Sequence, residues 1–320
     1  MAIFTRHVVT DVSVVVCTRS DDRWSDLARA VESVERQSRR PVELVVVVDH
    51  NPALLERARA RWPSAKVVPN DGAPGLSGAR NTGVAHAVGD VIAFLDDDAV
   101  AAPDWLERLL EPYAQEQVLA VGGRIDADWV GGRPGWFPSE FDWVVGCTYT
   151  GAAASRQPVR NVIGANMSFR REVFEELEGF RSEIGRIGTI PAGCEETELC
   201  IRARRRWPDR TVLYEPAAVV RHRVPPARAT LRYFVSRCFA EGRSKALVAR
   251  LVGSGNALST EARYTARVLP AGFGRGVADA VRRRDRGGAG RAGAIVVGLA
   301  ATAGGFALGR LSPGRVGRRA

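Results

Sequence analysis

The chain has 320 residues, of which 45% are hydrophobic, and it carries a formal net charge of +10. This length leaves room for one large α/β domain and an appendage. The five cysteines form no Cys-x-x-Cys pair, so we expect reduced thiols, and residues 12–17 are too short an apolar run for a secretory signal. We therefore expect a cytoplasmic protein.

The positive charge is concentrated in the last hundred residues. Residues 221–320 contain 20 Lys and Arg against 4 Asp and Glu, whereas residues 1–220 are net acidic. A basic region on an acidic domain suggests a polyanionic partner. We find no nucleic-acid-binding motif, so we expect an anionic membrane surface and no nucleic acid.

The first hundred residues alternate between strand and helix patterns. Apolar runs of strand length occupy residues 12–17 and 42–48, and the spacing of apolar residues in 24–38 predicts a helix between them. Two further helices and one short strand are expected over residues 52–62, 77–88 and 65–68. Strands that alternate with helices indicate βαβ units and a mostly parallel α/β sheet with flanking helices.

A cluster of carboxylates follows the next apolar run. Residues 91–95 lead directly into Asp96, Asp97 and Asp98. Clustered acids at the end of a buried strand are unfavourable unless a cation lies among them. Because ligands bind beyond the carboxyl ends of strands in such sheets, the acids could hold Mn²⁺ or Mg²⁺. A solvated acidic turn is the alternative.

Several segments together resemble a glycosyltransferase of family 2. The resemblance covers roughly residues 10–225. It rests on Val-Val-Val-Cys-Thr-Arg at 14–19, Val-Val-Asp at 47–49, Gly-Leu-Ser-Gly-Ala-Arg-Asn at 75–81, Phe-Leu-Asp-Asp-Asp at 94–98, Gly-Ala-Asn-Met-Ser-Phe-Arg-Arg at 164–171, Glu-Glu-Thr-Glu-Leu-Cys-Ile-Arg at 195–202 and Val-Val-Arg-His at 219–222. It implies the Rossmann-like GT-A fold and an inverting, metal-aided transfer of a sugar from a nucleotide-sugar.

The resemblance assigns metal ligands. Asp96 and Asp98 match the first and third positions of the family's D-x-D motif. We expect Asp98 to be the direct ligand and Asp96 to contact the ribose or the metal. His222 is expected to complete the site, although a lone His is more often structural, and Asp97 could be only structural.

The resemblance also assigns donor-binding residues. Asp49 would contact the nucleobase, but the family's second acid is replaced by His50, and Asp49 could instead cap a helix. Arg80 could reach the pyrophosphate, or it could be an exposed helix residue. The other expected donor contacts lie after the first strand and in the segment that lines the sugar pocket: Thr18, Arg19, Gly164, Ala165 and Asn166.

An inverting transfer needs a general base for the acceptor hydroxyl. Glu196 matches the second acid of the family's Glu-Asp pair, so it is the expected base, with Glu195 as the runner-up. Glu in place of Asp adds one methylene, and both acids could instead favour the start of a helix. Aromatic residues of 127–158, among them Trp136 and Trp143, could stack on an acceptor sugar or belong to the core.

The C-terminal region divides into three expected parts. Residues 226–271 are expected to be a helical extension, 272–291 a Gly- and Arg-rich linker, and 292–309 a membrane-associating helix between Arg291 and Arg310. As a helix, the uncharged segment would be about 27 Å long and could barely span a bilayer core of roughly 30 Å. An in-plane placement, or a soluble tail, would be the alternatives.

Together these features predict a metal-dependent transferase at the cytoplasmic side of the cell membrane. The expected partners are a UDP- or GDP-sugar donor and a lipid-linked or cell-envelope glycan acceptor. A soluble cytoplasmic enzyme is the alternative localisation. Two other functions stay open: a sugar-nucleotide pyrophosphorylase, and a non-catalytic membrane scaffold with a decayed transferase domain.

Overall fold

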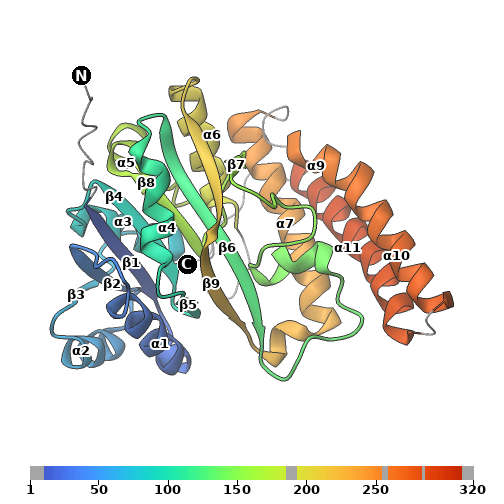
Figure 1. Ribbon diagram of the computed structural model, residues 1–320, viewed down its shortest axis with the longest axis horizontal. Coiled ribbons are helices and arrows are strands. Elements are labelled where there is room, and N and C mark those ends of the chain that lie inside the picture. The colour runs from blue at the N-terminus through green and yellow to red at the C-terminus, as the bar shows by residue number, and fades with distance from the viewer. Residues whose placement is uncertain (1–10, 185–192, 254–258, 283–284, 312–320) are drawn as a thin grey trace, which may run out of the picture.

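The first half of the sheet is parallel, as the sequence predicts. A computed structural model describes residues 11–184, 193–253, 259–282 and 285–311, and within these the sheet has nine strands (Figure 1). The first four strands are β1 (Val12–Thr18), β2 (Glu43–Val48), β3 (Lys66–Pro69) and β4 (Val91–Asp96), in the order β3-β2-β1-β4. Val14, Val15 and Val16 are all buried, so both faces of β1 are covered.

Beyond β4 the sheet becomes mixed. The strand next to β4 is antiparallel to it, and the sheet continues through an antiparallel pair and then a parallel pair. These strands are β8 (Asn166–Arg170), β6 (Val118–Trp129) and β9 (Thr211–Val224), with β5 (Ala99–Ala101) and β7 (Gln157–Pro158) paired to β9. The pairing of β5 with β9 sets His222 opposite Ala99, which directly follows Asp98.

Helices cover both faces of the sheet. On one face, Leu27 and Val31 of one helix and Trp105 of another share a hydrophobic core with Val14. On the other face, Phe174 and the remaining helices pack against the opposite side of the strands. The first face is covered by α1 (Trp24–Glu35), α2 (Pro52–Arg61) and α4 (Trp105–Leu110), and the second by α3 (Leu76–His86), α5 (Arg171–Leu177) and α6 (Glu195–Arg206).

The C-terminal region forms a helical layer at the end of the molecule away from α1 and α2 (Figure 1). It consists of α7 (Leu231–Val252), α9 (Ser259–Arg263), a π-helical turn (Tyr264–Val268), α10 (Leu269–Arg282) and α11 (Arg286–Leu311). The predicted helical extension is thus confirmed for its described part. The short 3₁₀ turn Pro226–Ala229 leads from β9 into α7.

The linker expected over 272–291 is wrong, because most of this segment lies in α10 and α11. Glycine disfavours an isolated helix by about 1 kcal/mol per residue, so its composition suggested irregular structure. Here the glycines allow close helix contacts instead. A Cβ on Gly276 would lie 2.8 Å from the carbonyl oxygen of Gly288, and one on Gly288 would lie 2.6 Å from that of Gly276.

The aromatic residues of 127–158 belong to the core. Phe137 is buried, and its ring centroid lies 5.0 Å from that of Trp129 and 5.3 Å from that of Phe234 on α7. Trp136 packs on the same rings, and Trp143 donates to the Tyr264 hydroxyl at 3.2 Å. These contacts attach α7 and the π-helical turn to the α/β domain.

One helix in the described part of the chain, Gly287–Leu311, is long and apolar enough to cross a membrane. A third of its most apolar stretch is nevertheless buried inside the protein. Close contacts with α7 account for part of this burial, since a Cβ on Gly305 would lie 2.0 Å from the carbonyl oxygen of Phe239. The helix is therefore packed along the protein rather than separate from it.

This packing can be tested with two neighbouring glycines of α11. Gly305→Val should lower the free energy of unfolding by about 1–3 kcal/mol, because the new side chain meets the α7 backbone. Gly304→Val is the matched control, since a Cβ there meets nothing within 4 Å. Urea denaturation of both variants provides the measurement. Equal stability of the two variants would show that α11 does not pack on α7 in solution.

Candidate active site

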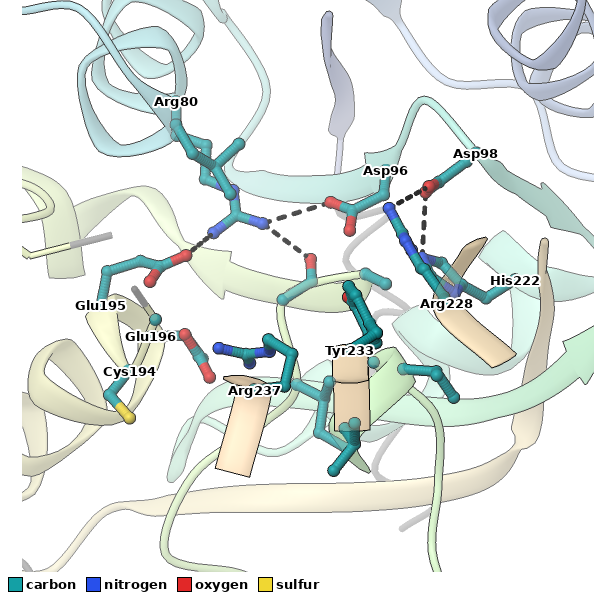
Figure 2. Close-up of a pocket in the computed structure, with 18 of the residues that line it drawn as sticks. Arg80, Asp96, Asp98, Cys194, Glu195, Glu196, His222, Arg228, Tyr233 and Arg237 are labelled. Atoms are coloured by element: carbon teal, nitrogen blue, oxygen red, sulfur yellow. Dashed lines mark hydrogen bonds and ion pairs between the residues drawn. The ribbon is translucent and has the colours of Figure 1, made fainter. Parts of the chain in front are cut away.

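A cavity of about 140 Å³ lies beyond the carboxyl end of β4. Its wall comprises the end of β4, the segment before β8, the start of α6, and residues of β9 and α7. Figure 2 shows carboxylates and arginines converging on it, with Tyr233 and Arg237 of α7 on the side opposite Arg80. The C-terminal helical layer therefore completes a site that the α/β domain begins.

Asp96, Asp98 and His222 form a cluster with the composition of a metal site. One ligand atom from each of the three lies within 4.8 Å of the others. His222 Nε2 lies 2.9 Å from Asp98 Oδ1, as the pairing of β5 with β9 requires. Gly146 lies against the imidazole ring, where a Cβ would come within 3.4 Å of the His222 Cε1 atom. The three residues that the sequence assigned to the metal are thus brought together.

Three cationic groups surround Asp98. Besides His222, Arg228 and Arg23 approach Asp98 Oδ2 at 3.2 and 3.3 Å. Burial alone would raise the pKa of Asp98, but these neighbours outweigh burial and hold it well below its usual value. Burial opposes the charge of His222, yet the adjacent Asp98 carboxylate holds the His222 pKa well above its usual value. The cluster is therefore arranged around an ionised carboxylate.

These residues fit a divalent cation. Two carboxylates and one imidazole suit Mn²⁺ better than Mg²⁺, which prefers all-oxygen ligands. Asp98 is 6% exposed and already attracts the positive charges nearest to it. Asp96, Asp98 and His222 would hold the ion.

Asp97, the middle acid, faces away from this cluster. Its Oδ2 accepts a hydrogen bond from Thr18 Oγ1 at 2.8 Å, and its Oδ1 accepts one from Arg23 at 2.6 Å. Burial raises the pKa of Asp97 to about 6. Asp97 thus ties the end of β1 and Arg23 to the acidic segment.

Arg80 connects the metal cluster with the acidic start of α6. It is 2% exposed and donates to Glu195 at 2.8 Å, to Asp96 at 3.3 Å and to the Gly164 carbonyl at 3.2 Å (Figure 2). Gly164 and Ala165 also line the cavity. The alternative prediction, that Arg80 is an exposed helix residue, is therefore wrong.

The two glutamates at the start of α6 differ in their surroundings. Glu195 is buried with one oxygen on Arg80, and its Oε2 has no hydrogen-bond partner among the described residues. Glu196 lines the cavity, and burial, followed by the charge of Glu195, raises its pKa to about 8. Glu196 thus lies in the cavity with a pKa in the range of proton-transfer groups, its carboxyl mostly protonated at neutral pH, and Glu195 is a fixed partner of Arg80.

Four residues that were expected to contact the donor do not line the cavity in this structure. The Asp49 carboxylate accepts hydrogen bonds from Asn70 at 2.7 Å and from the Gly75 amide at 3.1 Å, so it shapes the loop before α3. Asn166 is fully buried and joins Trp105 of α4 to the backbone of β6 and β9. Thr18 is bonded to Asp97, and Arg19 is exposed.

Other cavity residues had no role in the sequence analysis. Arg23, Arg228, Tyr233 and Arg237 all line the cavity. Arg228 and Arg237 belong to the basic C-terminal region, whose charge we assigned entirely to a membrane surface. That charge excess was a signal, but sequence spacing could not show that β9 returns these arginines to the acids of β4.

The mixed sheet, with acids and a histidine beyond β4, has the GT-A fold of solved glycosyltransferases. The model of "Glycosyl transferase family 2" matches residues 13–178, more than half of the chain. The protein therefore belongs to glycosyltransferase family 2 and is an enzyme of that family. The expected GT-A fold class is confirmed.

Relatives and solved structures agree with this assignment. A glucosyl-dolichyl phosphate glucuronosyltransferase of Haloferax volcanii is 40% identical over 238 residues, which cover 73% of this chain and 76% of the relative. The succinoglycan biosynthesis protein ExoM of Rhizobium meliloti is 26% identical over 239 residues, 73% of each chain.

Two solved structures share the fold. The mannosyltransferase PcManGT of Pyrobaculum calidifontis, in complex with GDP-Man and Mn²⁺, matches with a TM-score of 0.59 and 19% identity over 92% of this chain and 89% of its own. GalNAc-T7 with UDP, GalNAc and Mn²⁺ matches with a TM-score of 0.53 and 17% identity over 82% of this chain and 57% of its own.

The metal cluster predicts a contrast between two adjacent acids. Asp98→Asn should abolish Mn²⁺-dependent binding of UDP or GDP, because it removes the charged ligand at the centre of the cluster. Asp97→Asn is the control, since Asp97 faces Thr18 and Arg23. Calorimetric titration of each variant with nucleotide, with and without Mn²⁺, provides the measurement. Near wild-type metal-dependent binding in Asp98→Asn would contradict the assignment.

Proposed function

We propose that this enzyme is a metal-dependent inverting glycosyltransferase with a UDP- or GDP-sugar as donor and a hydroxyl of a lipid-linked or cell-envelope glycan as acceptor. The observation that carries the proposal is the arrangement of the cavity. The Asp96, Asp98 and His222 cluster lies on one side of Arg80, and Glu195 and Glu196 lie on the other. This arrangement provides a place for a diphosphate and a place for a base.

Glu196 is the proposed general base. It would take the proton of the acceptor hydroxyl as the oxygen attacks the anomeric carbon on the face opposite the departing nucleoside diphosphate. The sugar bond to the new oxygen forms as the bond to the diphosphate breaks, which inverts the anomeric centre. The pKa of about 8 makes the ionised Glu196 carboxylate a stronger base than an ordinary glutamate, and it predicts that this ionised form, and transfer with it, increases as the pH rises toward about 8.

Arg80 and Glu195 position the reacting groups. Arg80 contacts Asp96 and Glu195 at once, so it links the donor side to the start of α6. A divalent cation bound by Asp96, Asp98 and His222 would stabilise the negative charge of the departing diphosphate. Arg228 and Arg23, which lie against Asp98, are the nearest arginines that could add to that stabilisation.

The acceptor and the location rest on the Haloferax volcanii relative. The name of that enzyme describes transfer to glucosyl-dolichyl phosphate, which is a lipid-linked sugar. We therefore propose a lipid-linked acceptor and an enzyme at the cytoplasmic side of the cell membrane. A thermal-shift screen with Mn²⁺ can identify the donor, because bound ligand stabilises the fold, and UDP-glucuronic acid comes first in that screen.

The alternatives considered from sequence are not supported. The chain belongs to a transferase family, and residues 18–24 contain no glycine, so they lack the Gly-rich loop that a pyrophosphorylase needs after the first strand. A non-catalytic scaffold is also not supported, since the acids, the histidine and the arginines converge on one cavity.

The proposed base is tested by a pair of substitutions. Glu196→Gln should keep donor binding and lower transfer by about 10²-fold or more, because the amide cannot accept the hydroxyl proton. Glu195→Gln should instead lower stability, since it weakens the pair with buried Arg80. Transfer assays and donor titrations on both variants separate the two roles. An active Glu196→Gln beside an inactive, stably folded Glu195→Gln would reverse the assignment.

A further inference from the structure

Several large apolar side chains of the two outer helices are exposed. On α10, Phe273, Val277 and Val281 are spaced four residues apart, so they form one stripe, and they are 42, 41 and 74% exposed. The exposed apolar side chains of the neighbouring helix α11 are Val296, Val297, Leu299, Leu308 and Leu311. Exposed apolar side chains that gather on neighbouring helices mark interaction sites. We call the two sets together the α10–α11 face.

The opposite side of α11 packs against the rest of the protein. Ala292 and Ile295 are buried, and a Cβ on Gly298 would lie 2.5 Å from the Phe141 ring. Gly309 lies against the α7 backbone at Arg243. A helix that crosses a bilayer on its own is surrounded by lipid, whereas α11 lies along a helix that carries charged residues. Only one side of α11 is therefore available to a partner.

The charge around this face is positive. Arg263, Arg267 and Arg282 are exposed and form no ion pair with any residue that the structure describes. The nearby acids Asp279 and Asp285 are both paired with Arg291, at 2.9 and 2.8 Å. Unpaired arginines beside apolar side chains favour a partner that is negatively charged at its surface and apolar below it.

We propose that the α10–α11 face docks in the plane of an anionic lipid bilayer, without crossing it. Its apolar side chains would enter the boundary between headgroups and acyl chains, and its arginines would contact lipid phosphates. The proposed function enters only through the lipid-linked acceptor that such docking would present to the cavity. A second copy of the chain fits less well, because a twofold contact would bring the same arginines together.

Flotation with lipid vesicles tests the docking surface. The full chain should float with vesicles of phosphatidylglycerol and phosphatidylcholine in equal parts, and less well in high salt or with pure phosphatidylcholine. Combined Phe273→Asp and Leu299→Asp should lower the bound fraction at least about tenfold. Val88→Asp is the matched control, since Val88 is 67% exposed beside β4, at the other end of the molecule. Arg263→Gln, Arg267→Gln and Arg282→Gln together should weaken binding to anionic vesicles only.

Three outcomes would overturn the proposal. Flotation that the apolar substitutions leave unchanged would show that another surface binds lipid, and bound protein that resists alkaline carbonate would show a membrane-spanning segment. A change from dimer to monomer in light scattering, without vesicle binding, would assign the face to a second copy. Donor hydrolysis by each variant is measured in parallel. If a variant loses flotation but still hydrolyses the donor, it is folded and active, and the loss of flotation supports docking through this face. Loss of hydrolysis alone would count against the proposed transferase function and not against docking.

Discussion

The arrangement of the site depends on one buried cation, Arg80. A guanidinium that is almost entirely removed from water must be paired, because an isolated buried charge costs several kcal/mol. Its partners come from three places in the chain: Asp96 at the end of β4, Gly164 before β8, and Glu195 at the start of α6. The hydrogen bonds and ion pairs of Arg80 therefore fix the distance between the acids beyond β4 and the glutamates of α6.

The mixed half of the sheet supplies the remaining residues of the site. There β6 lies between β8 and β9, and the pairing of β9 with β5 sets His222 beside Asp98. The same strand leads through Arg228 into α7, whose Tyr233 and Arg237 line the cavity. The site is thus closed by a layer that lies beyond residues 13–178, the part that the family model matches.

Sequence patterns predicted the parts that depend on local order. The parallel strands and the acids that end β4 follow from apolar runs, the metal trio follows from the family resemblance, and the structure brings Asp96, Asp98 and His222 together. The patterns did not show where buried polar side chains would find partners. Asp49 and Asn166 form hydrogen bonds with neighbouring loops and strands, and only the three-dimensional packing reveals these partners.

The C-terminal layer was the hardest part to predict. The glycines of residues 272–291 signal a linker by composition, yet they lie where helix backbones approach closely, as Gly276 and Gly288 show. Close approach is a property of two segments, so the sequence of one segment cannot reveal it. For the same reason the arginines at 228 and 237 were counted as surface charge, although they face the acids of the cavity.

A double-mutant cycle between Arg80 and Glu195 tests the central claim most directly. Arg80→Met alone should lower the free energy of unfolding by roughly 3–5 kcal/mol, because it leaves Glu195 buried without a countercharge. Adding Glu195→Gln should recover part of that loss, which gives a coupling well above the roughly 0.5 kcal/mol of independent sites. Losses that simply add would contradict the account, since they would mean that Arg80 does not hold the start of α6 to the donor side.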